Sequence, residues 1–202
     1  MTGVAIIDNG GANIASLRFA LQRLGVESRL TADVAELRRA QRVILPGVGA
    51  AADAMQRLHA LGLVEAIAQL TQPVLGICLG MQLLFAASEE GVDGDDTECL
   101  GIVAERASRL AGRPDLPVPH MGWNQLRVTA QSPLFDGITD GEHVYFVHSF
   151  AAPVGPWTLA TTDYGGEFSS AVKHENFYGV QFHPERSARV GSRVLANFLG
   201  LG

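Results

Sequence analysis

The side chain best suited to covalent chemistry is Cys78, in the run Gly76-Ile77-Cys78-Leu79-Gly80. The apolar stretch 74–77 before it predicts a buried parallel strand. Small residues two places before and after the cysteine permit a sharp turn from strand into helix, which would lift the thiol out of the core. Backbone N–H groups at such a helix start favour a thiolate. On its own the run is equally compatible with an inert buried cysteine.

A possible base and its orienting group occur near the end of the chain, in Gly179-Val180-Gln181-Phe182-His183-Pro184-Glu185. This run ends a predicted strand, so in an open α/β sheet it can reach the same edge as Cys78. His183 can take a proton from the thiol, and Glu185 can accept from the other ring nitrogen. Each could instead be structural, as a packed histidine or a carboxylate at a helix start. Together with Cys78 they favour a Cys-His-Glu triad.

Two further features could complete such a site. The run Pro46-Gly47-Val48-Gly49 ends another predicted strand, and its glycines would let main-chain N–H groups turn toward a developing oxyanion. The alternative is an ordinary strand-ending turn. Gln82 follows Cys78 by one helical turn and so lies on the same helix face. It could touch a substrate at the thiol, or simply be solvated.

The composition limits the class of protein. The 202 residues, 47% hydrophobic and 18% charged, predict one globular domain over 1–202. The net charge of −6, without a Lys/Arg cluster, argues against nucleic-acid binding. Two cysteines make no disulfide framework, and the histidines lack metal-ligand spacing, so we expect neither metal nor cofactor. No signal segment precedes the first strand and no apolar run could span a membrane, which predicts a cytoplasmic protein.

The order of the elements predicts the fold. In the first half, strands at 4–7, 28–30, 43–45 and 74–77 alternate with helices at 13–24, from 33 onward, and up to 70 with an interruption near 62. The second half is expected to hold a helix after Cys78, an exposed acidic connector at 88–98, strands at 101–104, 125–129, 144–147, 158–161, 170–172 and 178–182, and a last helix at 187–199. The fold class is therefore α/β, doubly wound, with a mixed, mostly parallel central sheet flanked by helices.

The chain as a whole resembles the triad-type (class I) glutamine amidotransferases, whose fold is flavodoxin-like. Within them it is most similar to the glutaminase subunits of imidazole glycerol phosphate synthases. The matching pieces occur in family order and span nearly the whole chain: 46–49, 76–82, Pro119-His120-Met121-Gly122-Trp123-Asn124, Tyr145-Phe146-Val147-His148-Ser149 and 181–185.

The resemblance implies roles for individual residues. Cys78 would be the nucleophile, with His183 and Glu185 as partners, and the N–H groups of Val48 (after a peptide flip) and Leu79 would form the oxyanion hole. The remaining roles would be glutamine binding, by Gly47, Gly49, Gln82, His148, Ser149 and Phe150, and contact with the synthase partner, by His120, Met121, Trp123, Asn124, Tyr145 and Arg186.

The implied activity is hydrolysis of L-glutamine to glutamate and ammonia through a cysteine thioester. The ammonia would serve a separate (β/α)8-barrel cyclase, forming a heterodimer that makes imidazole glycerol phosphate and AICAR in histidine biosynthesis. Two alternatives remain open: a glutaminase subunit for pyridoxal phosphate or anthranilate synthesis, and a catalytically silent regulatory homologue.

The chain departs from the family pattern at four positions. The first loop usually reads Asp-Tyr-Gly-x-Gly-Asn, and here Asn9 and Ala12 differ. Arg186 replaces a common Lys, and Phe150 a common Tyr. These departures affect the details of partner contact rather than the triad.

Trp123 could be an ordinary core aromatic or part of the partner surface. His120, Gly122 and Asn124 alternate with it and offer little apolar surface for a core strand. Aromatic residues and arginine are enriched where proteins bind one another. We therefore expect Trp123 to be exposed, on the same face as the opening to Cys78.

Overall fold

The computed structural model describes residues 3–10, 14–91 and 95–201. The predicted helix start at Asn13 and the unusual Ala12 lie outside these residues. The first half contains, in order, β1 (Val4–Ile7), α1 (Ile14–Arg23), β2 (Ser28–Thr31), α2 (Val34–Arg39), β3 (Arg42–Gly47), α3 (Ala51–Ala60), α4 (Val64–Ala68), β4 (Val74–Cys78) and α5 (Leu79–Gln82). The predicted alternation of strands and helices is confirmed.

The second half is mostly strands. In order it contains β5 (Phe85–Ser88), β6 (Thr97–Glu98), β7 (Val103–Arg109), β8 (His120–Gln125), β9 (Arg127–Val128), η1 (Pro133–Phe135), β10 (His143–His148), β11 (Phe150–Ala151), β12 (Thr158–Asp163), β13 (Glu167–His174), β14 (Phe177–Val180), η2 (Pro184–Arg186) and α6 (Ala188–Gly200).

The central sheet of the described chain has the order β2-β1-β3-β4-β14-β13-β12-β9. The pairs from β2 to β14 are parallel, and those from β14 to β9 are antiparallel. The expected mixed, mostly parallel sheet is therefore present. Because β4 lies between β3 and β14, the ends of these three strands meet at one edge, where ligands bind in open α/β sheets.

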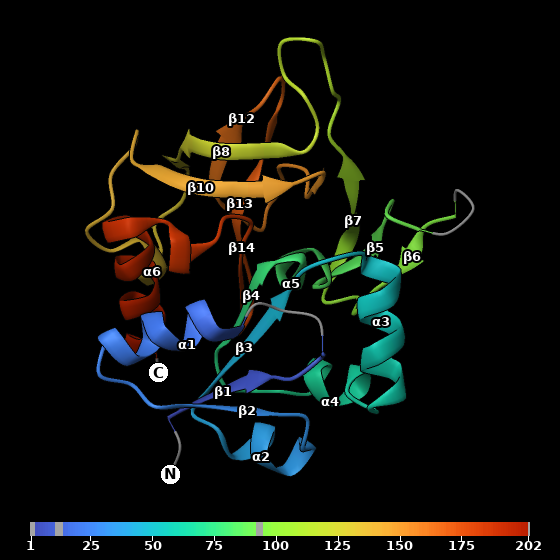
Figure 1. The fold of residues 1–202 in the computed structure, drawn as a ribbon, viewed down its shortest axis with the longest axis vertical. Coiled ribbons are helices and arrows are strands. Elements are labelled where there is room, and N and C mark those ends of the chain that lie inside the picture. Colours follow the sequence, from blue (N-terminus) through green and yellow to red (C-terminus); the bar gives the residue numbers. More distant parts are fainter. Residues whose placement is uncertain (1–2, 11–13, 92–94, 202) are drawn as a thin grey trace.

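Alternation along the strands places a core on each face of this sheet. On β1, Val4 and Ile6 pack with α1 and α6, whereas Ala5 and Ile7 pack with α2, α3 and α4. The strands are apolar on both faces because helices cover both, which is typical of parallel sheets. Figure 1 shows α1 and α6 together on one side and α3 with α4 on the other.

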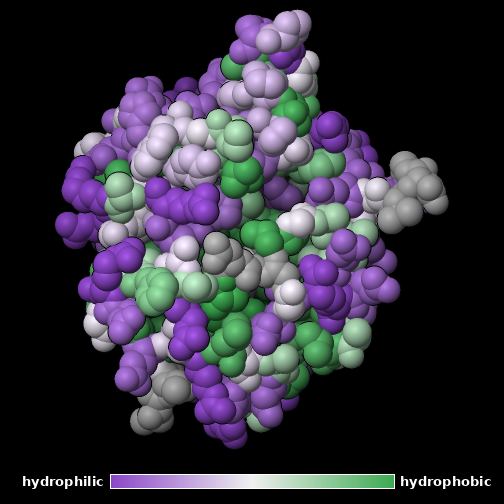
Figure 2. Space-filling model, viewed as in Figure 1, coloured by the Kyte–Doolittle hydropathy of each residue, from purple (hydrophilic) through white to green (hydrophobic). Residues whose placement is uncertain are grey.

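Two smaller sheets lie beyond the carboxyl ends of the parallel strands. The antiparallel pair β8–β10 crosses above β4 and α5 in Figure 1, and the four-stranded sheet β11-β7-β5-β6 lies beside α3. Figure 2 shows apolar residues gathered in the middle of this face, where the upper and lower parts of the molecule meet. None of the described helices is long and apolar enough to cross a membrane.

Three predictions about the second half are wrong in detail. The helix after Cys78 has only four residues, and Phe85 already begins a strand. Every residue from Leu79 to Phe85 is buried, so the apolar spacing carries no helical signal there. Strands β8 and β9 replace the single predicted strand at 125–129, and β7 runs to Arg109 rather than ending at 104.

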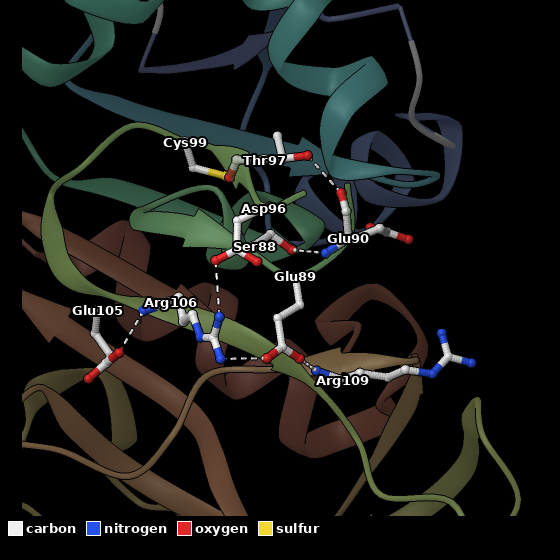
Figure 3. Close-up of polar contacts among 9 residues, drawn as sticks. All are labelled: Ser88, Glu89, Glu90, Asp96, Thr97, Cys99, Glu105, Arg106 and Arg109. Atoms are coloured by element: carbon white, nitrogen blue, oxygen red, sulfur yellow. Dashed lines mark hydrogen bonds and ion pairs between the residues drawn. The ribbon is translucent and has the colours of Figure 1, made fainter. Parts of the chain in front are cut away.

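The acidic segment 88–98 is not simply a solvated connector. Ser88 is buried at the end of β5, and its hydroxyl accepts from the N–H of Glu90, while Thr97 donates to the Glu90 carbonyl (Figure 3). The Glu89 carboxylate pairs with Arg106 at 2.8 Å. Glu89 and Asp96, which both pair with Arg106, thus tie this segment to β7.

Candidate active site

The turn at Cys78 has the geometry of a nucleophile elbow. Cys78 ends β4 with φ 54° and ψ −112°, a backbone conformation that residues other than glycine rarely adopt. The glycines around it are required by close packing. A Cβ on Gly76 would lie 2.5 Å from the carbonyl oxygen of Gly80, and a Cβ on Gly47 would lie 2.7 Å from the Gly80 nitrogen. The strained backbone holds the thiol at the strand end while glycine lets β3, β4 and α5 approach.

His183 and Glu185 make the contact that the sequence predicts. The Nδ1 of His183 lies 2.9 Å from Oε1 of Glu185, and both side chains are 10% exposed. The turn η2 begins at Pro184 and brings the carboxylate back to the ring. The N–H of His183 donates to the carbonyl of Tyr145 at 2.9 Å, which fixes the histidine to β10.

The surroundings of His183 favour the imidazolium. Burial alone would lower its pKa, but interaction with a Cys78 thiolate and with the Glu185 carboxylate outweighs burial and raises the pKa to about 10. The Nε2 atom is buried and makes no hydrogen bond within the described structure. Catalytic hydrogen bonds commonly tighten only when substrate is bound, so the thiol and ring are arranged for a contact that is not yet closed.

A cavity of about 380 Å³ brings the predicted groups together. Its walls include the triad and every residue assigned to the oxyanion hole or to glutamine, namely Gly47, Val48, Gly49, Leu79, Gln82, His148, Ser149 and Phe150. Leu79 opens α5, so its N–H has no acceptor within the helix. Gly49 has φ 89°, a value that suits glycine alone and gives this loop its turn.

The amide of Gln82 is buried rather than solvated. Its Nε2 donates to the Phe150 carbonyl at 2.7 Å and to Oε1 of Gln181 at 2.9 Å. Gln181 is fully buried, and its own Nε2 lies 3.7 Å from Sγ of Cys78. The sequence pattern alone does not indicate a role for Gln181. Its position two residues before His183, directly after the strand beside β4, was the available signal.

A second residue that sequence reasoning missed is Glu90. It lines the cavity, and its Oε2 accepts from the N–H of Ala51 at 3.0 Å. Burial raises the pKa of this carboxyl, while Ala51 and the Arg109 guanidinium act in the opposite direction. The neighbouring Glu89 is paired with Arg106 (Figure 3), and of the described acidic residues of this segment Glu90 is the one that lines the cavity.

Cys99 is chemically quiet by comparison. It is buried, and burial, followed by the charges of Glu90 and Glu98, raises the pKa of its thiol to about 12. It therefore stays a neutral thiol near pH 7. Among the described residues, no three His, Cys, Asp or Glu side chains are placed to hold a metal ion.

The unusual Asn9 contacts the predicted oxyanion loop directly. It is 2% exposed, and its Nδ2 donates to the carbonyl of Pro46 at 3.2 Å. The side chain thus ties the first loop of the chain to the segment 46–49. The departure from the family pattern has a structural consequence at the active site.

The residues assigned to the partner face divide into two groups. Met121 and Trp123 are exposed, at 67% and 53%, which confirms the expectation for Trp123. His120 is 3% exposed and lies beneath this face, so its predicted place on the surface is wrong. The reason is strand alternation in β8, which turns His120 inward and its neighbours outward.

The outward residues form a row that reaches the triad. The ring of Trp123 meets that of Tyr145 edge-on at 6.0 Å, and the Arg186 guanidinium lies 5.9 Å from the Tyr145 ring centroid. Arg186 also lines the cavity. Trp123 is therefore connected to the cavity by consecutive contacts. Asn124, in contrast, lies on the inward side of β8 and donates to the carbonyl of Asp163 at 3.0 Å.

The strained Cys78 at the end of a parallel strand and the paired His183 and Glu185 after the neighbouring strand form a Cys-His-Glu triad on a doubly wound sheet. The family model described as "Glutamine amidotransferase class-I" matches residues 5–200, and the chain belongs to this family.

Two curated relatives show which members of this family the chain is similar to. The chain is 53% identical over 199 residues to the "Imidazole glycerol phosphate synthase subunit HisH" of Xylella fastidiosa strain Temecula1, covering 98% of each chain. It is equally identical to the protein of that name from Xanthomonas axonopodis pv. citri, with the same coverage.

Solved structures agree on the fold. A putative GMP synthase subunit from Thermoplasma acidophilum superposes with a TM-score of 0.73 at 20% identity, covering 98% of this chain and 92% of that one. A structure described as a glutamine amidotransferase also reaches 0.73, at 19% identity and with 98% and 97% coverage.

Proposed function

We propose that this protein is the glutaminase subunit of an imidazole glycerol phosphate synthase, with residues 1–202 acting as a single glutamine amidotransferase domain in the cytoplasm. It hydrolyses the side-chain amide of L-glutamine and supplies the ammonia to a cyclase subunit in histidine biosynthesis. Full-length similarity to subunits of that name supports the assignment. The observation that carries it is the His183–Glu185 pair in the same cavity as the strained Cys78.

The reaction proceeds in two halves. The Cys78 thiolate attacks the amide carbon of glutamine, and the C–N bond breaks as the imidazolium of His183 gives its proton to the leaving ammonia. His183, now neutral, accepts a proton from water, which attacks the thioester and releases glutamate and the thiolate. Glu185 stabilises the positive ring at each stage through the contact at Nδ1.

The negative charge on the amide oxygen needs donors in both halves. The N–H of Leu79, free at the start of α5, is one donor. The N–H of Val48 is the second, and the glycines on both sides allow its peptide to take two orientations. One oxyanion donor is typically worth roughly 100- to 1000-fold in rate. The isolated chain is therefore a poor glutaminase that the partner activates by fixing this peptide.

The cavity also fits the charges of an amino acid. The Glu90 carboxylate is placed to bind the α-ammonium group of glutamine. The segment from His148 to Phe150 also lines the cavity, and we propose that it binds the α-carboxylate. Glutamine then extends its amide toward Sγ.

The row Arg186, Tyr145 and Trp123 is the face for the partner, which we propose to be a (β/α)8-barrel cyclase. Trp123 is exposed and Tyr145 is partly exposed, and aromatic residues and arginine are the side chains that most often dominate protein–protein binding. The row begins at the cavity, so a partner covering it would receive ammonia before bulk water protonates it.

The test is a glutaminase assay with and without a candidate cyclase and its ligand. Wild-type protein should release glutamate faster in the complex. Cys78→Ala should abolish glutamine-dependent turnover while added ammonium salts still drive the synthase reaction. Glutamine hydrolysis that survives in Cys78→Ala, or a wild-type complex without glutamine-dependent activity, would overturn the proposal.

A further inference from the structure

Beneath the exposed face of β8 and β10 lies a continuous run of polar side chains, which begins at the partly exposed Asn124 and continues through two buried histidines. The Nδ2 of Asn124 lies 3.4 Å from Nε2 of His120, and Nδ1 of His120 lies 3.0 Å from Nε2 of His148. The Nδ1 of His148 lies 2.8 Å from the carbonyl oxygen of Phe150. The two histidines face each other across the strand pair and are 3% and 6% exposed.

The direction of every hydrogen bond in the run follows from the Phe150 carbonyl at its end. A carbonyl can only accept, so Nδ1 of His148 carries the proton. Burial lowers the pKa of His148 to about 3 and of His120 to about 4, so both rings are neutral near pH 7. The Nε2 of His148 must then accept, which makes Nδ1 of His120 the donor. The remaining nitrogen of His120 accepts from Asn124, and all donors point toward the cavity.

The Phe150 carbonyl is where this run meets the active site. It also accepts from Gln82, whose amide contacts Gln181, and Gln181 reaches the thiol of Cys78. The carbonyl has two lone pairs, and one donor serves each. Removing the His148 donor would leave a buried acceptor with one of its two partners missing, beside the glutamine site.

The ring of His120 is also held by packing. It stacks against Phe146 with centroids 4.8 Å apart and against Tyr164 at 4.0 Å, both tilted by 24°. Its position therefore follows that of β8, the strand that carries Met121 and Trp123. No catalytic step uses His120, yet its Nδ1–H is the donor that Nε2 of the buried His148 accepts.

We propose that His120 is a positioning residue: through His148 it holds the Phe150 carbonyl, and with it the 148–150 segment, in the geometry that binds glutamine. The inference rests on the proposed function. Its mechanism predicts an effect on substrate binding rather than on the nucleophile, because the hydrogen-bonded run ends on a wall of the cavity. Loss of one buried hydrogen bond should raise the KM for glutamine about 5- to 10-fold, with kcat changing less.

The experiment compares three variants in the complex with the cyclase. His120→Leu removes both ring nitrogens, whereas His120→Asn keeps an N–H donor near the place of Nδ1. Phe146→Leu damages the same packing without removing a hydrogen bond. We expect a raised KM in His120→Leu, near wild-type KM in His120→Asn, and near wild-type KM in Phe146→Leu despite a comparable fall in melting temperature. Nitrogen NMR should show the Nδ1-protonated His148 tautomer in wild type and a shifted Nε2 resonance in His120→Leu, because that nitrogen has lost its donor.

The outcomes separate the two proposals. If the wild-type complex hydrolyses no glutamine, the proposed function fails and this inference fails with it. If wild type is active and His120→Leu keeps its KM, or if Phe146→Leu raises KM equally, the positioning role alone is wrong. The alkylation rate of Cys78 by iodoacetamide should be unchanged in His120→Leu, and a large decrease would likewise contradict a role confined to the substrate wall.

Discussion

Glu185→Gln removes one negative charge from the triad and leaves its shape nearly unchanged. The Nδ1–Oε1 distance of 2.9 Å and the 10% exposure of both side chains describe a charge-assisted hydrogen bond shielded from water. Such bonds contribute about 1.5–3 kcal/mol. At 1.36 kcal/mol for each tenfold change, we expect the pKa of His183 to fall by about 1 to 2 and kcat/KM for glutamine to fall roughly 10- to 100-fold.

The assay is glutamate release by the complex between about pH 6 and pH 10. The raised pKa of His183 keeps wild-type imidazolium present far above neutral pH, so the alkaline limb of the profile should move to lower pH in Glu185→Gln. Glu167→Gln is the matched control, because Glu167 pairs with Arg127 at 3.0 Å on the surface and such pairs contribute little.

The pH dependence of thermal stability is a second test of the His183–Glu185 pair. The folded-state pKa of His183, about 10, lies above the ordinary 6.5. Protonation therefore stabilises the folded chain fully below about pH 6.5, and this stabilisation is lost as pH rises toward 10. Glu185→Gln should shrink that pH-dependent loss relative to wild type. If the variant keeps wild-type kcat/KM and both pH profiles are unchanged, Glu185 does not orient or charge His183.

Three other substitutions test separate parts of the site. Asn9→Ala removes the donor to the Pro46 carbonyl and should loosen the oxyanion loop, so we expect kcat at saturating glutamine to fall about 5-fold. An unchanged kcat would contradict this role of Asn9. Glu90→Gln should raise the KM for glutamine about 10-fold at nearly constant kcat, and a selective loss of kcat would refute ammonium binding. Trp123→Ala should weaken cyclase binding by about 2 kcal/mol or more in calorimetry, while a lowered melting temperature with normal binding would place Trp123 in the core.

The triad and its cavity could be predicted because their signals are local. Gly76 and Gly80 flank Cys78 as a sharp turn requires, and Glu185 follows His183 closely enough to bond its ring. The rule that parallel strands present their carboxyl ends at one edge then places both runs together. Apolar strand patterns likewise identified the central sheet, since burial on both faces leaves few other choices.

The parts that failed depend on contacts between distant segments. The partners of Gln82 are Phe150 and Gln181, 68 and 99 residues away, and no local pattern specifies them. The sequence around Trp123 suggests that His120 also lies on the surface. The pairing of β8 with β10 determines which face of β8 is buried, and His120 lies on the buried face while Trp123 lies on the exposed one. Glu90 looked like part of a solvated acidic run because its contact with Ala51 is tertiary.

The buried polar side chains behind the cavity all have hydrogen-bond partners, whereas two polar atoms of the triad have none in the described structure. An unsatisfied buried donor or acceptor costs about 1–3 kcal/mol, so stability alone would favour apolar side chains at Gln82, Gln181 and His148. Each of these has hydrogen-bond partners, so the wall of the site is rigid. Of four buried side-chain polar atoms without a partner in the described structure, two are Nε2 of His183 and Oε2 of Glu185. The hydrogen-bonding capacity left open at the triad is what a substrate and an attacking water can use.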